Sequence, residues 1–191
     1  MEEILPAKKQ ITKEAILNAA LEIIRGGGAE SLNVREIAKR CGCSTQPVYS
    51  AFGGMEGLKS ELSGLVAKKF SDYIDGVIAS GKYPQYKAIG MGYIGFAKEH
   101  KELFKYLMMT RHDESHEWEN LSYDVSTGVI RDNYGIERSK AEILHTELWI
   151  FVHGVATMFA TDYFDWDWDL VSKMVTDAFN GFSNNLNGEK Q

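Results

Sequence analysis

From Met55 to the end of the chain, apolar residues recur every three or four positions, and no stretch alternates between apolar and polar residues. A spacing of three or four places apolar side chains on one face of an α-helix, whereas alternation would indicate a β-strand. The pattern therefore predicts an all-α fold, of about nine helices when the short N-terminal ones are included. The helices of this second part are expected near 55–79, 84–100, 101–110, 116–134, 138–161 and 166–186.

The start of the chain predicts two short helices separated by glycine. Thr12 is a candidate N-cap for a helix that ends at Arg25, because the glycines at 26–28 favour a left-handed cap. Asn33, with Glu36 three residues later, has the spacing of a capping box and predicts the start of the second helix.

A third helix is predicted directly after a tight turn at Gly42. Ser44 is its expected N-cap, which puts Pro47 in the first turn, where the missing N–H is not needed. Val48 and Phe52 lie four residues apart and are expected to face inward. Two short helices joined by a glycine turn match a helix-turn-helix motif, whose second helix enters the major groove of DNA.

The side chains left on the outside of this motif suit a DNA surface. Glutamine can bond adenine, serine and threonine can bond base edges or phosphates, and tyrosine suits phosphate. Small polar residues at a helix start also serve as plain caps, but their combination with Arg35, Lys39 and Tyr49 favours DNA. The candidate DNA-binding residues are Lys13, Asn33, Arg35, Ser44, Thr45, Gln46, Tyr49, Ser50 and Lys59.

Charge is distributed unevenly between the two parts of the chain. Residues 1–66 contain 8 Lys/Arg and 8 Asp/Glu, so the net charge of −6 belongs entirely to residues 67–191, which contain 13 and 19. A neutral first part (residues 1–66, the head) before an acidic second part (residues 67–191, the body) is compatible with a modest, salt-sensitive DNA contact. It argues against a protein that coats DNA.

Residues 10–66 resemble the N-terminal domain of the TetR/AcrR family of transcriptional repressors. The resemblance rests on an Ala/Ile/Leu-rich first helix, the step AESLNVREIAKRCGCS and the segment VYSAFGGMEGL. It implies a helix-turn-helix DNA-binding domain over 1–54, then a linking helix and an all-helical effector-binding and dimerisation domain over 55–191. It also implies a ligand-responsive regulator, a repressor that binds a palindromic operator in double-stranded DNA as a homodimer and needs no cofactor.

Two features depart from the usual family pattern. Met55 stands where the family has a Lys or Arg that holds a phosphate, and Lys59, one turn later, is the candidate substitute. Gly57 and Gly64 lie in the linking helix, where glycine costs about 1 kcal/mol relative to alanine. They are expected either to soften that helix or to be tolerated on its surface.

The last two predicted helices are unusually rich in apolar residues. The segment 143–164 is apolar nearly all round, and the segment 166–182 has one apolar stripe. Two adjacent helices of this kind suit a homodimer bundle, as the family resemblance also implies, or they complete the core of a single chain.

The resemblance also implies a ligand pocket inside the body. Trp149, His153 and Gly154 resemble the WHG signature of one branch of the family. Aromatic and methionine side chains form adaptable apolar cavities, although each residue taken singly fits a plain core equally well. The expected effector is a small hydrophobic or aromatic molecule. The candidate effector-binding residues are Tyr93, Phe96, Phe104, Leu107, Met108, Trp118, Leu121, Trp149 and His153.

Metal chemistry is not indicated by the histidines and cysteines. Cys41 and Cys43 lack the spacing of a zinc or redox pair and are expected to be reduced, small core residues. His112 and His116 have the spacing of a metal clamp on a helix, but their polar surroundings favour a solvated loop.

Enzymatic and membrane functions are likewise not expected. The sequence contains no nucleophile elbow, phosphate loop or zinc motif. No apolar run approaches the ~18 residues of a membrane span, and the N-terminus lacks the apolar region of a signal peptide, so a cytoplasmic protein is expected. The remaining alternative is a relative that keeps the helical body as a partner-binding scaffold and no longer binds DNA.

Overall fold

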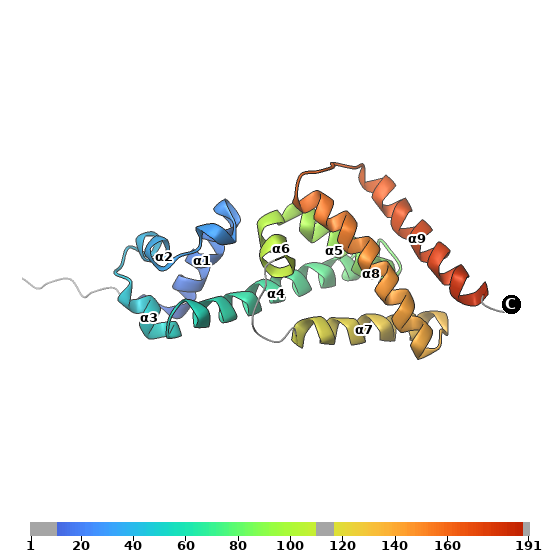
Figure 1. The fold of residues 1–191 in the computed structure, drawn as a ribbon, viewed down its shortest axis with the longest axis horizontal. Coiled ribbons are helices and arrows are strands. Elements are labelled where there is room, and N and C mark those ends of the chain that lie inside the picture. Colours follow the sequence, from blue (N-terminus) through green and yellow to red (C-terminus); the bar gives the residue numbers. More distant parts are fainter. Residues whose placement is uncertain (1–10, 110–116, 189–191) are drawn as a thin grey trace, which may run out of the picture. The chain divides into compact units, whose positions relative to one another are not determined.

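The computed structural model describes residues 11–109 and 117–188, the latter range with the backbone only at 117–122 and 187–188. Every regular element within these ranges is a helix, which confirms the predicted all-α fold (Figure 1). The elements are α1 (Lys13–Gly27), the 3-10 helix η1 (Ala29–Ser31), α2 (Val34–Cys41), α3 (Gln46–Phe52), α4 (Met55–Ala79), α5 (Gln85–Glu99), α6 (Lys101–Met108), α7 (Glu117–Tyr134), α8 (Arg138–Ala160) and α9 (Trp168–Gly188).

The helix boundaries follow the sequence pattern closely, and α1 shows both an agreement and a difference. Thr12 caps the start of this helix as predicted, because its Oγ1 accepts a hydrogen bond from the Ala15 N–H at 3.1 Å. The helix does not end at Arg25, since it continues to Gly27 and Gly28 forms the cap. The Gly28 N–H donates to the Ile24 carbonyl at 2.8 Å with φ at 72°, so one of the three glycines supplies the positive φ and the other two remain helical.

The chain divides into two compact units, Met1–Leu65 and Val66–Gln191, and the division falls within α4. In the first unit, α1 packs against both α2 and α3. Its core consists of fully buried aliphatic side chains, namely Ile16, Ala20, Ile24, Ile37, Val48, Leu58 and Leu62. These residues occupy one face of each helix, which leaves the opposite faces to polar residues.

Gly57, at the start of α4, allows a close approach rather than serving as a point of flexibility. A Cβ atom at this position would lie 2.1 Å from the Phe52 carbonyl oxygen, which is far inside van der Waals contact. Gly64 differs, because a Cβ atom there would meet no atom within 4 Å. Gly57 therefore does not soften the linking helix at this point. Because it has no Cβ atom, the first turn of α4 can pack tightly against the end of α3.

The second unit is built around α5, which packs against α6, α7, α8 and α9. An aromatic cluster forms one part of its core, and its rings meet edge to face. The Phe70 ring centroid lies 5.4 Å from that of Tyr93 and 5.2 Å from that of Phe96, and Tyr93 lies 5.5 Å from Phe104. Such edge-to-face pairs add about 0.5–1.5 kcal/mol each beyond the area that they bury.

Within the residues that the structure describes, one helix, α8, is long and apolar enough to cross a membrane by length and composition alone. The expectation that no segment reaches this threshold is therefore wrong, because the charged residues of α8 all lie in its first ten positions and leave residues 148–160 uncharged. One such helix is weak evidence for a membrane span, since the core helix of a soluble protein passes the same test.

Candidate nucleic-acid interface and ligand cavity

The turn between α2 and α3 is set by Gly42. This residue adopts the left-handed conformation, with φ at 64° and ψ at 35°, which favours glycine. The Gly42 N–H donates to the Lys39 carbonyl at 3.1 Å and the Cys43 N–H to the Ala38 carbonyl at 3.0 Å. These two bonds have the arrangement of a Schellman cap, so the turn that precedes α3 has a defined geometry.

The start of α3 lies one residue later than predicted. Thr45, not Ser44, is the cap residue, and its side chain makes no capping hydrogen bond. The Thr45 carbonyl accepts from both the Val48 and the Tyr49 N–H, at 3.1 and 3.4 Å. Pro47 is consequently the second residue of the helix, where its lack of an N–H leaves no bond unmade.

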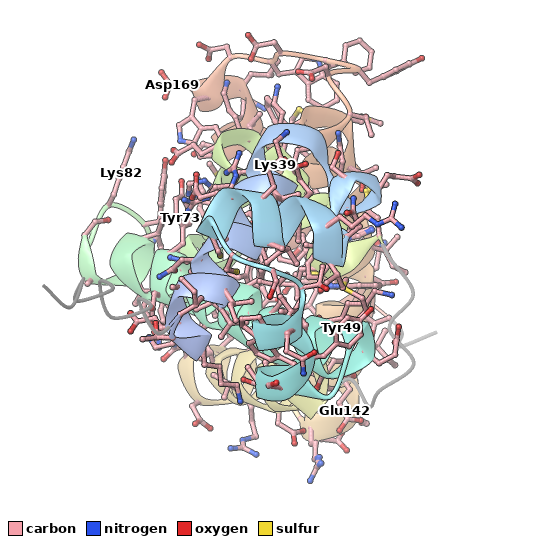
Figure 2. The ribbon with its side chains drawn as sticks, turned by 90° about the vertical axis from the view of Figure 1, so that its left-hand side faces the viewer. Lys39, Tyr49, Tyr73, Lys82, Glu142 and Asp169 are labelled. Atoms are coloured by element: carbon pink, nitrogen blue, oxygen red, sulfur yellow. The ribbon has the colours of Figure 1, made fainter. Side chains whose placement is uncertain are left out.

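The outer face of α3 carries the polar residues that the sequence placed there. Gln46, Tyr49 and Ser50 are exposed, Tyr49 at 52%, while Val48 and Phe52 are buried on the other side. Gln46 Nε2 donates to Ser50 Oγ at 3.3 Å, so these two side chains lie together one turn apart. Figure 2 labels Tyr49 on α3 and Lys39 on α2 of this unit.

The other predicted DNA-binding residues belong to the same unit as α3, and the side chains of three of them have partners within it. Arg35 and Ser44 are exposed, and Thr45 is half-buried. Asn33 caps α2, since its Oδ1 accepts from the Glu36 N–H at 2.9 Å and its Nδ2 donates to the Ser31 carbonyl. The remaining two are lysines: Lys13 pairs with Glu61 at 2.5 Å and lies over the Phe52 ring, and Lys59 pairs with Glu56 at 3.1 Å.

Exposed ion pairs of this type contribute only about 0–1 kcal/mol, so both pairs are weak ones. The replacement of the basic residue missing at Met55 by Lys59 stays a prediction, whereas the side chain of Asn33 is already used to cap the start of α2.

Cys41 and Cys43 are free, as predicted, and both are half-buried rather than part of the core. Burial and the neighbouring Cys43 raise the pKa of the Cys41 thiol above its usual value, which keeps it protonated at neutral pH.

A ligand-sized cavity of about 360 Å³ lies in the second unit, between α5, α8 and α9. Its volume is at the lower end of the range for small-molecule sites, about 300–1,000 Å³. Its walls are mainly apolar and aromatic. The lining residues are Pro84, Tyr86, Lys87, Ile89, Gly90, Tyr93, Tyr134, His145, Leu148, Trp149, Val152, Val175, Thr176, Phe179 and Asn180.

The structure brings only part of the predicted effector set to this cavity. Tyr93 and Trp149 line it, and His153 lies directly behind them, with its Nδ1 2.8 Å from the Tyr93 hydroxyl and its ring stacked on Trp149. Phe96, Phe104 and Leu107 are buried outside its lining, and half-buried Met108 is also outside it. The side chains of Trp118 and Leu121 lie outside the described part of the chain, as do His112 and His116.

A second tyrosine–histidine pair was missed by the sequence analysis. The Tyr86 hydroxyl and His145 Nδ1 share a hydrogen bond at 3.0 Å, and both residues line the cavity. The signal was available, because Tyr86 lies seven residues before Tyr93 on α5, and His145 lies eight residues before His153 on α8. Two such pairs, about two helical turns apart, therefore tie α5 to α8.

Both histidines are neutral at physiological pH. Burial lowers the pKa of His145 to about 4 and also lowers the pKa of His153. The two imidazoles thus act as hydrogen-bonding groups and not as cations. Among the residues that the structure describes, no group of three His, Cys, Asp or Glu side chains is placed to hold a metal ion.

Comparisons with known proteins agree with this architecture. Residues 16–62 match the family "Bacterial regulatory proteins, tetR family", and residues 86–178 match "Tetracyclin repressor-like, C-terminal domain". A search of curated protein sequences gave no match.

Solved structures share the fold at low sequence identity. A TetR-like transcriptional regulator from Rhodococcus sp. RHA1 matches with a TM-score of 0.70 and 14% identity, over 96% of this chain and 100% of that one. A TetR-family protein from Vibrio parahaemolyticus matches with a TM-score of 0.62 and 16% identity, over 88% and 96%. NalD, the secondary repressor of the MexAB-OprM multidrug efflux pump in Pseudomonas aeruginosa, matches with a TM-score of 0.55 and 14% identity, over 88% and 94%.

A helix-turn-helix unit followed by an all-helical unit defines a class of transcriptional regulators, not of enzymes. The two family matches together cover most of the chain, which belongs to the tetR family of bacterial regulatory proteins.

Proposed function

We propose that this protein is a cytoplasmic transcriptional repressor that binds a palindromic DNA operator as a homodimer and responds to a small hydrophobic effector. The observation that carries the proposal is the exposed polar face of α3, next to a turn that Gly42 fixes. The effector would bind in the 360 Å³ cavity and shift the balance between conformations that bind the operator well and poorly.

The DNA contacts proposed for α3 follow from its chemistry. Gln46 offers a carbonyl and an amide to an adenine edge, and the Ser50 hydroxyl beside it suits a base edge or a phosphate. Tyr49 and Arg35, both exposed, are proposed to bond phosphates, and Lys13 and Lys59 to exchange their glutamates for phosphates.

Exposed apolar residues on α8 and α9 support the proposed homodimer. Ile143 and Ile150 are 50% and 60% exposed and lie seven residues apart, which places them on the same face of α8. Leu170 on α9 is 46% exposed. Large apolar side chains that a single chain leaves in water favour an interface, because burying each one contributes up to about 1.5–3 kcal/mol.

The proposal is tested by selecting bound sequences from a pool of random DNA duplexes at two salt concentrations. We expect an enriched palindrome whose half-sites lie about one helical turn apart, with weaker retention at high salt. Tyr49→Ala and Gln46→Ala should each weaken binding to that palindrome by about tenfold or more. The first removes a hydrogen bond to a charged phosphate, and the second removes a bidentate contact to a base. Tyr163→Ala is the matched control, since Tyr163 is 71% exposed and lies in the other unit.

Two results would contradict the proposal. If a folded dimer enriches no sequence, the protein is better explained as a partner-binding scaffold that has lost the DNA function. If a palindrome is enriched but both α3 variants bind it as tightly as the Tyr163→Ala control, the assignment of Gln46 and Tyr49 as DNA contacts is wrong. The proposal of a DNA-binding regulator would then still stand.

A further inference from the structure

The cavity between α5, α8 and α9 has an unusual charge for this chain. Its lining, as far as the described residues form it, includes one lysine, Lys87, and neither an aspartate nor a glutamate. Residues 67–191 carry 19 acidic and 13 basic side chains, yet the one charged side chain named in this lining is basic. His145 adds no second cation, because its imidazole is neutral at pH 7.

Lys87 is held in the lining by uncharged groups. Its Nζ donates to Thr176 Oγ1 at 2.8 Å, across from α5 to α9, and lies 5.2 Å from the centroid of the Tyr83 ring. No carboxylate within the described part of the chain forms an ion pair with it. Thr176 Oγ1 in turn donates to the Ser172 carbonyl, so its own proton is already used.

An ammonium group has three N–H donors, and the bond to Thr176 uses one of them. Asn180, one turn after Thr176 on α9, adds an amide donor to the same side of the lining. The part of the lining around Lys87 therefore offers several donors and one positive charge, which suits a single carboxylate. A phosphate, with a second negative charge, would call for more cationic partners than one lysine.

The rest of the cavity is suited to an apolar body. Leu148, Val152 and Val175 are buried side chains in its lining, and Phe179 and Trp149 contribute aromatic rings. Because water is a poor occupant of such surroundings, an alkyl or aryl group gains free energy from entering them.

We infer that the effector is a hydrophobic monocarboxylate whose carboxylate accepts hydrogen bonds from Lys87 Nζ and whose alkyl or aryl body fills the apolar part of the cavity. This inference rests on the proposed function, since it names the chemical class of the effector. It narrows the class expected from the sequence, which was hydrophobic or aromatic without any statement of charge.

Isothermal titration calorimetry on the full-length protein tests the inference with matched probes. Octanoate is compared with octanol and octylamine, and phenylbutyrate with phenylbutanol, so that the apolar body stays constant while the polar group changes. The variants are Lys87→Met, which removes the charge, and Lys87→Arg, which keeps it. Lys82→Met is the control, because Lys82 also lies over the Tyr83 ring, at 5.3 Å, but does not line this cavity.

We expect a carboxylate to bind the wild type at least about tenfold more tightly than its alcohol, the difference that one charged hydrogen bond makes. The Lys82→Met control should keep this preference, Lys87→Arg should keep most of it, and Lys87→Met should lose it. Thermal unfolding of each variant without ligand shows whether the fold is intact.

Three results would overturn the inference: equal binding of alcohol and carboxylate, a carboxylate preference that survives in Lys87→Met, or no binding by any probe. None of these results bears on the proposed DNA function, because the selection of an operator uses no ligand. Conversely, a carboxylate-binding protein that selects no DNA would refute the repressor and leave the ligand class in place.

Discussion

Replacing Ile150 with alanine is expected to weaken the proposed homodimer strongly while hardly affecting the single chain. Ile150 is 60% exposed on α8, so the fold itself gains little from this side chain. Full burial of an isoleucine contributes about 1.5–3 kcal/mol, and the share still to be buried at an interface is therefore roughly 1–2 kcal/mol for each chain.

A two-fold symmetric interface contains the substitution twice. The expected loss is thus about 2–4 kcal/mol for each dimer, which corresponds to a rise of roughly 30- to 1,000-fold in the dissociation constant. Sedimentation equilibrium over a dilution series measures this constant directly.

Val125→Ala is the matched control for this experiment. Val125 is an aliphatic residue on α7 with 57% exposure, so its truncation removes a comparable side chain from a helix outside the proposed interface. If Ile150→Ala shifts the dissociation constant no more than Val125→Ala does, the α8 face is not the dimer interface and the reasoning fails.

Three further predictions concern stability, each measured by urea unfolding. Gly57→Ala should destabilise the protein, because its Cβ would lie 2.1 Å from a backbone oxygen. Gly64→Ala should stabilise it by up to about 1 kcal/mol, because a Cβ there meets no atom. Changes in the free energy of unfolding that have the same sign for both variants would contradict this. Thr12→Ala should cost about 1 kcal/mol through loss of the cap on α1, and an unchanged midpoint would show that this cap is unimportant. Burial lowers the pKa of His145 from 6.5 to about 4. The contribution of His145 to the free energy of unfolding is therefore greatest above pH 6.5 and should fall by up to about 3 kcal/mol as the pH drops to 4. His145→Gln should reduce this pH dependence, and an identical slope in the variant would assign it to other groups.

Most of the fold could be predicted from the sequence because its helices are bounded by strong local signals. Met55–Ala79 was predicted to the residue, and the Thr12 and Asn33 caps form as their spacing indicates. The start of α3 was placed one residue early, since Ser44 and Thr45 are equally good cap residues by type. Only the backbone conformation distinguishes them, and the sequence does not specify it that finely.

The ligand cavity was harder to predict, because its position depends on how the side chains of several helices pack together. Phe96 and Tyr93 are both aromatic residues on α5, and their spacing alone does not tell which of them faces a cavity. The structure packs Phe96 into the aromatic cluster and leaves Tyr93 at the boundary between that cluster and the cavity. Lys87 was overlooked for a related reason, since a lysine in a helix is read as a solvent-exposed residue until its partners are known.

The separation between the aromatic cluster and the cavity has a consequence for how this protein can evolve. Phe70, Phe96 and Phe104 stabilise the second unit and lie outside the lining, and of the clustered rings only Tyr93 also lines the cavity. Substitutions at most lining positions can therefore accumulate without weakening the cluster that supports the helices. New ligand specificities are accessible by single mutations at exposed lining residues such as Trp149 and Asn180, whereas a change at Tyr93, or at the buried residues Leu148 and His145, alters specificity and stability together.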